Sequence, residues 1–228
     1  MIFLILYIID AMATMYAEHV GLTTLLYATK ILLMPLMALY LFSQTKNIAQ
    51  HKFIYLALIF SWLGDILLMF PRTDTEPDKA KLLFVLGLIS FLIAHINYII
   101  HFVKEIKDKP KATLIIEKPY LVLPFIAYAI VMLSVLFPRL ASMKFPVTVY
   151  TIIILLMVMA AFNRKNLVNP TSFALVFIGA VIFVISDSCI AFNVFYKPFE
   201  LARFAIMATY TTAQFLSVYG VLKAKNFT

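Results

Sequence analysis

Residues 171–193 read TSFALVFIGAVIFVISDSCIAFN, and Asp187 is the only charged residue among them. A membrane-spanning helix needs about 20 predominantly apolar residues. In the hydrocarbon core only helices and closed barrels pair every backbone N–H and C=O, and barrel strands alternate polar and apolar residues. Because this run is apolar throughout, the sequence predicts a transmembrane helix that carries one carboxyl.

Similar apolar runs recur along the whole chain. The other predicted spans are residues 1–17, 24–43, 53–70, 82–103, 119–137, 145–163 and 199–222. The 228 residues are 64% hydrophobic and 13% charged, whereas soluble domains are about 45–50% apolar and about 25% charged. We therefore predict an all-α polytopic membrane protein, with a bundle of eight transmembrane helices that forms a single domain over residues 1–228.

The third and seventh predicted helices share a short pattern. Leu63-Gly64-Asp65 lies in the third and Ile185-Ser186-Asp187 in the seventh, so a small residue precedes an aspartate in both. This match indicates a weak four-plus-four internal repeat, in which the two helices would run in the same direction.

The net charge of +8 is distributed in short basic clusters between the apolar runs, as in the connector at residues 104–111. This distribution is typical of the cytoplasmic loops of membrane proteins, so we expect a lipid bilayer and no nucleic acid as partner. The bias of Lys and Arg among the loops favours a cytoplasmic position for both termini.

Asp65 and Asp187 lie deepest within long apolar runs. A charge at the bilayer centre costs roughly 2.5–3.5 kcal/mol on insertion scales, so such residues usually face the bundle interior and are functional. Each aspartate precedes the end of its span by about six residues, which places both about 9 Å below the same interface. Two carboxyls at one level can share a site, with one protonated and the other ionised. The alternative is that each aspartate pairs separately with a basic or polar group.

Other polar residues in the spans are candidates for supporting roles. His95 and Tyr98 share a helix face and are suited to proton relay or substrate orientation, or the histidine is simply satisfied by a neighbouring hydroxyl. Tyr210 and Gln214 lie one turn apart, and hydrogen bonding between helices explains them as well as catalysis does. Lys30 is suited to binding a lipid phosphate, or else it snorkels to the interface.

Asp10, close to one end of the chain in a short predicted span, is interpreted as an interfacial residue. The sequence lacks GxGxxG, Walker, GxSxG and HExxH motifs, and only two of its four histidines lie within spans. We therefore expect no cofactor and no metal site.

Several of these residues match one family in their order and in their placement on the helices. The matching residues are Lys30, Leu63-Gly64-Asp65, Phe91-x3-His95-x2-Tyr98, Gly179, Phe183, Ser186-Asp187 and Tyr210-x3-Gln214. Together they resemble the lysoplasmalogenase family of membrane proteins, called YhhN in bacteria, over nearly the whole chain. Ile31 is a departure, because the family often has proline after this lysine.

The resemblance implies hydrolysis of the vinyl-ether bond of lysoplasmalogens, which are single-chain ether phospholipids, to a fatty aldehyde and a glycerophospho-base. This reaction begins with proton delivery to an alkene carbon and forms an oxocarbenium ion. It therefore needs a general acid and a nearby negative charge, as in glycosidases. Our hypothesis is that Asp65 and Asp187 are these catalytic carboxyls and that Lys30 binds the phosphate. His95, Tyr98, Ser186, Tyr210 and Gln214 would then support proton movement or orientation.

Two other classes of function stay open. A small proton-coupled transporter would use the aspartates as proton sites, and discontinuous helices would be expected, for which Pro35 and Pro124 leave room. A lipid-binding or structural membrane protein would hold the two aspartates apart and individually paired.

Overall fold

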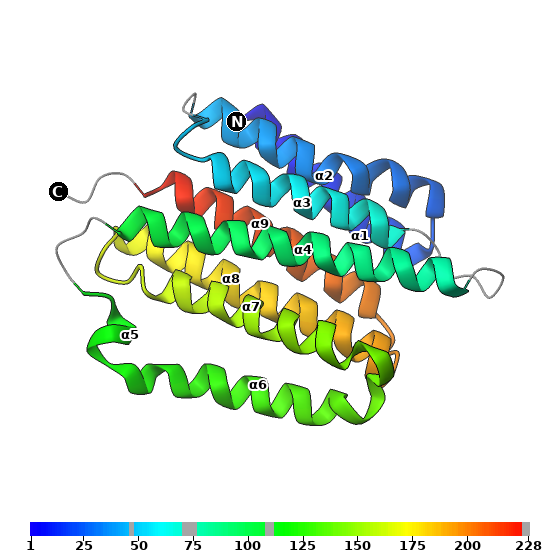
Figure 1. The fold of residues 1–228 in the computed structure, drawn as a ribbon. Coiled ribbons are helices and arrows are strands. Elements are labelled where there is room, and N and C mark those ends of the chain that lie inside the picture. The colour runs from blue at the N-terminus through cyan, green and yellow to red at the C-terminus, as the bar shows by residue number, and fades with distance from the viewer. Residues whose placement is uncertain (46–47, 70–76, 108–111, 225–228) are drawn as a thin grey trace. The chain divides into compact units, whose positions relative to one another are not determined.

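The computed structural model describes residues 1–45, 48–69, 77–107 and 112–224, and these residues form helices without any strand (Figure 1). Parts of two predicted connectors, residues 70–76 and 108–111, lie outside the described residues. Contacts within the chain divide it into two compact units, Met1–Tyr98 and Ile99–Thr228, and the division falls inside one long helix, α4. Each unit is described below by itself. The expected single domain over residues 1–228 stays a prediction.

The first unit contains three complete helices and the first part of a fourth. They are α1 (Ile2–Val20), α2 (Thr23–Gln44), α3 (Lys52–Met69) and α4 (Pro77–Ile106) up to Tyr98. Gly21 ends α1 with a left-handed backbone (φ 80°), and its N–H donates to the carbonyl of Ala17. This is the glycine cap that allows an immediate reversal, so α2 packs closely against α1.

A glycine explains how α3 and α4 approach each other in the first unit. A Cβ added at Gly64 would lie 2.6 Å from the ring of Phe91, which is too close for a real contact. Gly64 therefore accommodates the aromatic ring of α4 directly beside Asp65, whose side chain is buried. The Leu-Gly-Asp pattern thus combines a packing residue with a buried carboxyl.

The second unit begins with the end of α4 and contains the remaining elements. They are α5 (Leu114–Glu117), η1 (Pro119–Val122), α6 (Leu123–Leu136), η2 (Phe137–Arg139), η3 (Ala141–Met143), α7 (Lys144–Phe162), α8 (Pro170–Ala191), η4 (Phe192–Tyr196) and α9 (Ala202–Leu222). Helices α8 and α9 share the most extensive interface of the chain. Gly179 and Gly220 permit their close approach, because a Cβ at either position would collide with the opposite helix.

A buried arginine joins three parts of the second unit. Arg164 follows α7 and is completely buried. Its Nε donates to Glu105 Oε2 on α4 at 2.6 Å, and its Nη2 donates to Ser172 Oγ on α8 at 2.7 Å. The guanidinium also lies 5.4 Å from the ring centre of Phe102. From sequence, this arginine belongs to an ordinary polar connector, so its structural role was missed.

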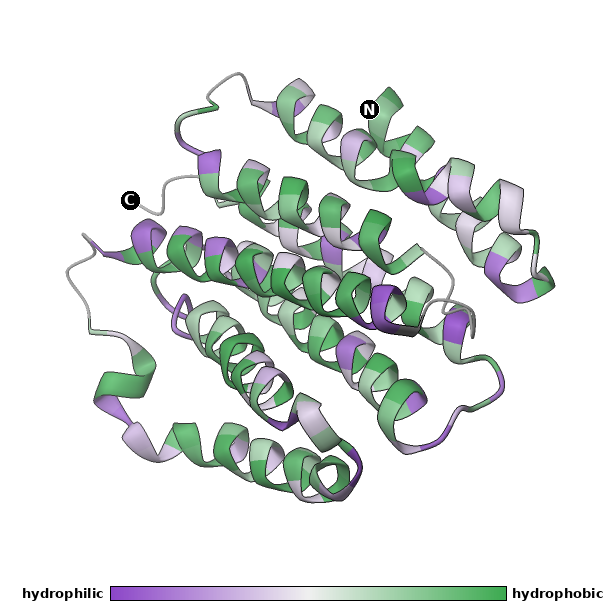
Figure 2. Ribbon diagram, turned by 45° about the vertical axis from the view of Figure 1, so that its right-hand side comes forward, coloured by the Kyte–Doolittle hydropathy of each residue, from purple (hydrophilic) through white to green (hydrophobic). Residues whose placement is uncertain are grey.

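Seven helical segments within the described residues are long and apolar enough to cross a membrane, and Figure 2 shows how apolar residues dominate the long helices. The structure therefore confirms an all-α polytopic membrane protein. The eighth predicted span, residues 199–222, is the helix α9, but its composition is less apolar than that of the other seven. The reason is a set of small or polar residues that α9 buries inside the unit, among them Thr211, Gln214 and Ser217.

Candidate functional site

Asp187 anchors a group of polar side chains on three helices of the second unit. Its Oδ2 accepts a hydrogen bond of 2.6 Å from the hydroxyl of Tyr150 on α7, and the carboxyl is half-buried on α8. The next residue, Ser188, shares a hydrogen bond with the hydroxyl of Tyr128 on α6 and donates to the carbonyl of Val184. Helices α6, α7 and α8 therefore all direct hydroxyl groups to one short segment of α8.

The two tyrosines of this group were not singled out from the sequence. A tyrosine within an apolar run has the same pattern whether it faces lipid or a carboxyl. Tyr128 and Tyr150 each pair with a residue about 40 to 60 positions further along the chain, so only the fold brings these partners together.

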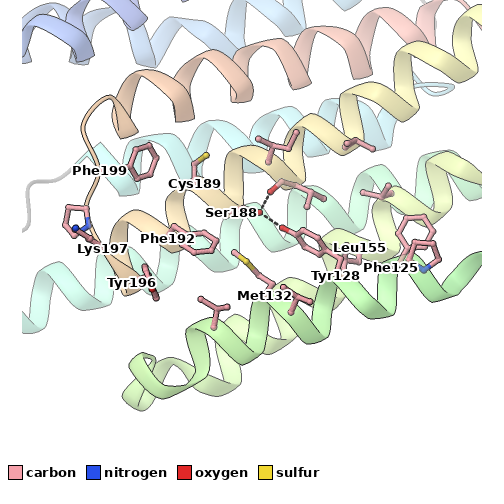
Figure 3. Close-up of a pocket in the computed structure, with 18 of the residues that line it drawn as sticks. Phe125, Tyr128, Met132, Leu155, Ser188, Cys189, Phe192, Tyr196, Lys197 and Phe199 are labelled. Atoms are coloured by element: carbon pink, nitrogen blue, oxygen red, sulfur yellow. Dashed lines mark hydrogen bonds between the residues drawn. The ribbon is translucent and has the colours of Figure 1, made fainter.

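A large apolar pocket lies beside this group in the second unit (Figure 3). Its volume is about 1080 Å³, at the upper end of the range of small-molecule sites. It is lined by Pro124, Phe125, Tyr128, Val131, Met132 and Val135 of α6, Leu155 and Val158 of α7, Val181, Val184, Ile185, Ser188 and Cys189 of α8, Phe192 and Tyr196 of η4, and Lys197, Pro198, Phe199 and Glu200. Asp187 is next to this wall, because Tyr128 and Cys189 both lie within electrostatic range of its carboxyl.

The polar groups of the pocket lie at two levels. The hydroxyl pair of Tyr128 and Ser188 lies along the wall, while Lys197 and Tyr196 mark one end, after the turn of π-helix η4 (Figure 3). Turns of π-helix are rare and frequently occur at functional sites. The guanidinium of Arg139 lies 4.2 Å from the ring centre of Tyr196, which brings a further cation to this end.

A second group of ionisable side chains lies in the first unit. Asp65 on α3 is 3% exposed, and Tyr7 on α1 is 2% exposed. Asp65, Asp10 and Tyr98 are the groups that act electrostatically on Tyr7. Helices α1, α3 and α4 thus contribute two carboxyls and two phenols to one buried region.

The interpretation of Asp10 as an interfacial residue is wrong. Its side chain is buried on the inner face of α1, and its Oδ2 has no hydrogen-bond partner among the described residues. The first span is short and close to one end of the sequence, so its length indicated a marginal helix. The structure instead extends α1 to Val20 and packs it along α2.

His95 and Tyr98 lie on α4 and are buried, with exposures of 1% and below. Both are therefore buried, as expected for polar residues that share a helix face inside a bundle. Lys30 is half-buried, two turns into α2, and belongs to the first unit. Their roles in proton relay and phosphate binding stay predictions.

The remaining predicted residues join α8 to α9. The Ser186 hydroxyl donates to the carbonyl of Ile206 at 3.2 Å, and Gln214 Nε2 donates to the Tyr210 hydroxyl at 3.4 Å. Tyr210 also packs edge-on against Phe183, with ring centres 6.0 Å apart. The Ser186 bond and the Phe183–Tyr210 contact cross from α8 to α9, whereas the bond between Gln214 and Tyr210 lies within α9. A supporting catalytic role stays a prediction.

Asp65 belongs to the first unit and Asp187 to the second, so their action as a pair stays a prediction. Within the described ranges, no three His, Cys, Asp or Glu side chains are grouped as a metal site requires.

The long apolar helices define a polytopic helical membrane protein, and ionisable groups are buried inside its spans. The model of the YhhN family matches residues 25–221, which is most of the chain. The chain therefore belongs to the YhhN family, which is the lysoplasmalogenase family. Neither a curated protein nor a solved structure matches the chain. The family match begins inside α2, so Tyr7 and Asp10 on α1 lie outside it.

Proposed function

We propose that the protein hydrolyses the vinyl-ether bond of single-chain ether phospholipids of the lysoplasmalogen type. Membership of the YhhN family supports a hydrolase of this kind. The structural observation that carries the proposal is the Asp187 carboxyl, which accepts the Tyr150 hydrogen bond and lies next to the wall of an apolar pocket. This arrangement combines a group that can transfer or stabilise a proton with space for an apolar substrate.

The reaction requires two carboxyl roles. A general acid transfers its proton to the second carbon of the alkenyl chain, and the first carbon becomes an oxocarbenium ion. A carboxylate stabilises this cation and then accepts a proton from the water that attacks the first carbon. The resulting hemiacetal breaks its bond to the glycerol oxygen and yields a fatty aldehyde and a glycerophospho-base. Asp65 and Asp187 are the two carboxyls in this proposal.

The other candidate residues have supporting roles in the same proposal. His95 and Tyr98 move or hold protons in the first unit, where both are buried. Ser186 and Tyr210 position Asp187 by holding α8 against α9, and Gln214 holds the Tyr210 hydroxyl within α9.

The direct test is aldehyde release by the purified full-length chain in lipid nanodiscs. We expect release from a lysoplasmalogen and none from its saturated alkyl-ether analogue, which differs only in lacking the double bond that is protonated. The variant Glu117→Gln is a matched control, because Glu117 is exposed on α5. Absence of aldehyde from the wild-type chain, or equal cleavage of both lipids, would contradict the proposal.

No observation favours the transporter alternative over hydrolysis. That alternative predicts discontinuous helices, but α2 continues as one helix through Pro35 and Pro124 lies in the first turn of α6, where proline is tolerated.

A further inference from the structure

We propose that the pocket between α6 and α8 is the binding site for a single-chain zwitterionic phospholipid, with its phosphate at Lys197 and its amine at Glu200. In this proposal the head group binds to residues of the second unit, and Lys30 of the first unit is not its binding residue. The identity of the occupant rests on the proposed function. The location of the site rests on the shape and charge of the pocket.

The length of the pocket matches one lipid chain. On α6 its lining extends from Pro124 to Val135, and on α8 it extends from Val181 to Phe192. At a rise of 1.5 Å per residue, each stretch is about 16 Å long. The hydrocarbon core of a bilayer is about 30 Å thick, so the pocket is about as long as one leaflet is deep. The two helices run in the same direction (Figure 1), and Arg139 after α6 lies beside Tyr196 after α8, so both stretches lead towards the end that holds Lys197.

The wall of the pocket is mainly apolar, as a binding site for the hydrocarbon chain of a lipid requires. Aliphatic and aromatic side chains form most of it, including Phe125, Met132 and Leu155, which point into the space shown in Figure 3. Met132 and Leu136 are the fully buried residues of α6, and its other side chains are half-buried or exposed, so one side of the pocket consists of a helix with much accessible apolar surface. A lipid chain can therefore enter sideways from the bilayer without crossing water.

The charged residues of the lining are confined to one end. Lys197 and Glu200 are exposed and follow directly after η4, three residues apart. A lysine ammonium binds phosphate as a point charge on a long flexible stem, and a carboxylate binds a cationic amine. Lys197, with Arg139 beside Tyr196, offers positive charge to a phosphate, and Glu200 offers a partner to an amine, so a zwitterionic head group finds a contact for each of its charges.

The proposed orientation of the lipid, with its head group at Lys197, also determines where in the pocket the bond to be cleaved lies. The hydroxyl pair of Tyr128 and Ser188 lies about two turns deeper than Lys197 along α8 and η4. A lipid whose phosphate contacts Lys197 directs the start of its chain towards this pair, and Asp187 is the adjacent residue on α8. The pocket thus leads from the membrane to Ser188, the residue next to Asp187, whose own side chain is not part of the lining.

Cys189 provides a direct readout, because it is the single cysteine of the chain and lies on the pocket wall. The experiment measures the rate at which an apolar maleimide labels Cys189 in the purified full-length protein. The probe is a lysophosphocholine with a saturated alkyl-ether chain, which the proposed reaction does not cleave. We expect saturating probe to slow labelling by at least about tenfold and native mass spectrometry to show one probe molecule per chain.

Three comparison lipids of the same chain length test the head group and the chain number. An alkylglycerol without charges and an alkyl phosphate without an amine should each require at least about tenfold higher concentration for equal protection, because each lacks a charge-assisted contact. A two-chain phosphatidylcholine should protect no better than the alkylglycerol. Equal protection by all four lipids would overturn the proposal and indicate a groove filled by bulk lipid.

Matched variants locate the contacts. Lys197→Ala and Glu200→Ala should each weaken protection by about tenfold, whereas Lys165→Ala, at an exposed lysine after α7, should not. Val181→Trp should abolish protection by filling the pocket, whereas Ile178→Trp, at an exposed residue one turn earlier on α8, should not. Protection that survives Val181→Trp would overturn the site. Slow labelling without lipid that depends on protein concentration would overturn it as well, because a second copy would then occupy the groove.

The binding experiment is independent of turnover. Protection by the probe without aldehyde release from a lysoplasmalogen would support the site and contradict the proposed hydrolysis. Aldehyde release without protection would support the proposed hydrolysis and contradict the site.

Discussion

The two units of the chain each hold a carboxyl among tyrosines, but they differ in access. Asp65 in the first unit is buried, and the neighbouring Tyr7 is enclosed by α1, α3 and α4. Asp187 in the second unit is half-buried, accepts a hydrogen bond from Tyr150 and has a large apolar pocket beside it. The first arrangement is suited to holding or moving protons in a closed interior. The second is suited to meeting an apolar ligand.

The largest expected effect comes from neutralising the carboxyls. Asp187→Asn and Asp65→Asn should each lower aldehyde release by about 10²- to 10⁴-fold, because a proton-transferring group in the transition state contributes this much. The double variant should lose little more than either single variant, since residues that act as one unit are not additive. Steady-state kinetics of the purified variants measures both effects.

Retained turnover in Asp65→Asn would restrict the chemistry to the second unit. Additive losses in the double variant would indicate that the two aspartates serve separate purposes. Glu117→Gln should keep the wild-type rate, because Glu117 is exposed on α5.

Helix packing should also be tighter in the second unit than in the first. A Cβ at Gly220 would lie 2.9 Å from the backbone nitrogen of Val176, and backbone cannot move cheaply. At Gly64 the obstacle is the ring of Phe91. We expect Gly220→Ala to lower the free energy of unfolding by about 3 kcal/mol and Gly64→Ala by about 1–3 kcal/mol, in the range for overpacked cores.

Thermal unfolding in detergent measures this difference. Gly87→Ala is the matched control, because the Cβ would collide with the Leu68 side chain, which can rotate away, and would only touch the backbone oxygen of Gly64 at 3.6 Å. A Gly220→Ala variant as stable as Gly87→Ala would show that α8 and α9 separate easily.

The hydrogen bond to Asp187 should have a smaller effect on catalysis. Tyr150→Phe removes the donor to the Asp187 carboxyl and should lower kcat by about tenfold, as expected for one hydrogen bond to a charged group. Tyr128→Phe should have a weaker effect, because its partner Ser188 also donates to the carbonyl of Val184. Equal effects of both substitutions would show that Tyr150 does not orient the carboxyl specifically.

The smallest effect is expected at Asp10 in the first unit. The Oδ2 of this buried side chain has no hydrogen-bond partner among the described residues, and an unpaired buried polar group costs stability. Asp10→Asn should therefore keep the free energy of unfolding or raise it by about 1 kcal/mol, which thermal unfolding measures as an unchanged or higher unfolding temperature. Aldehyde release should not change. A loss of aldehyde release with unchanged stability would instead assign Asp10 to the catalytic groups.

The sequence predicted the helices well, because apolar runs of membrane length have few alternative structures. It also predicted that Asp65, His95 and Tyr98 face an interior, since ionisable groups avoid lipid. The sequence did not indicate that α9 is less apolar than the other spans, a difference that arises because Thr211, Gln214 and Ser217 are buried inside the unit instead of facing lipid.

The partners of these residues were not predictable. Arg164 pairs with Glu105, which lies 59 positions earlier, and nothing local distinguishes it from a solvated connector residue. Tyr150 likewise meets Asp187 only through the packing of α7 on α8. The pocket could not be inferred either, because it depends on how far α6 stands from α8, and spacing between helices leaves no periodic signal in the sequence.

The most direct test of vinyl-ether hydrolysis is to carry out the reaction in D₂O and to reduce the aldehyde to an alcohol as it forms. Mass spectrometry should find one deuterium on the second carbon of the product from the wild-type chain, because the acid delivers a solvent-exchanged proton there, and Asp187→Asn should yield almost no product. An alcohol without deuterium at that carbon would mean that the bond breaks by a different route.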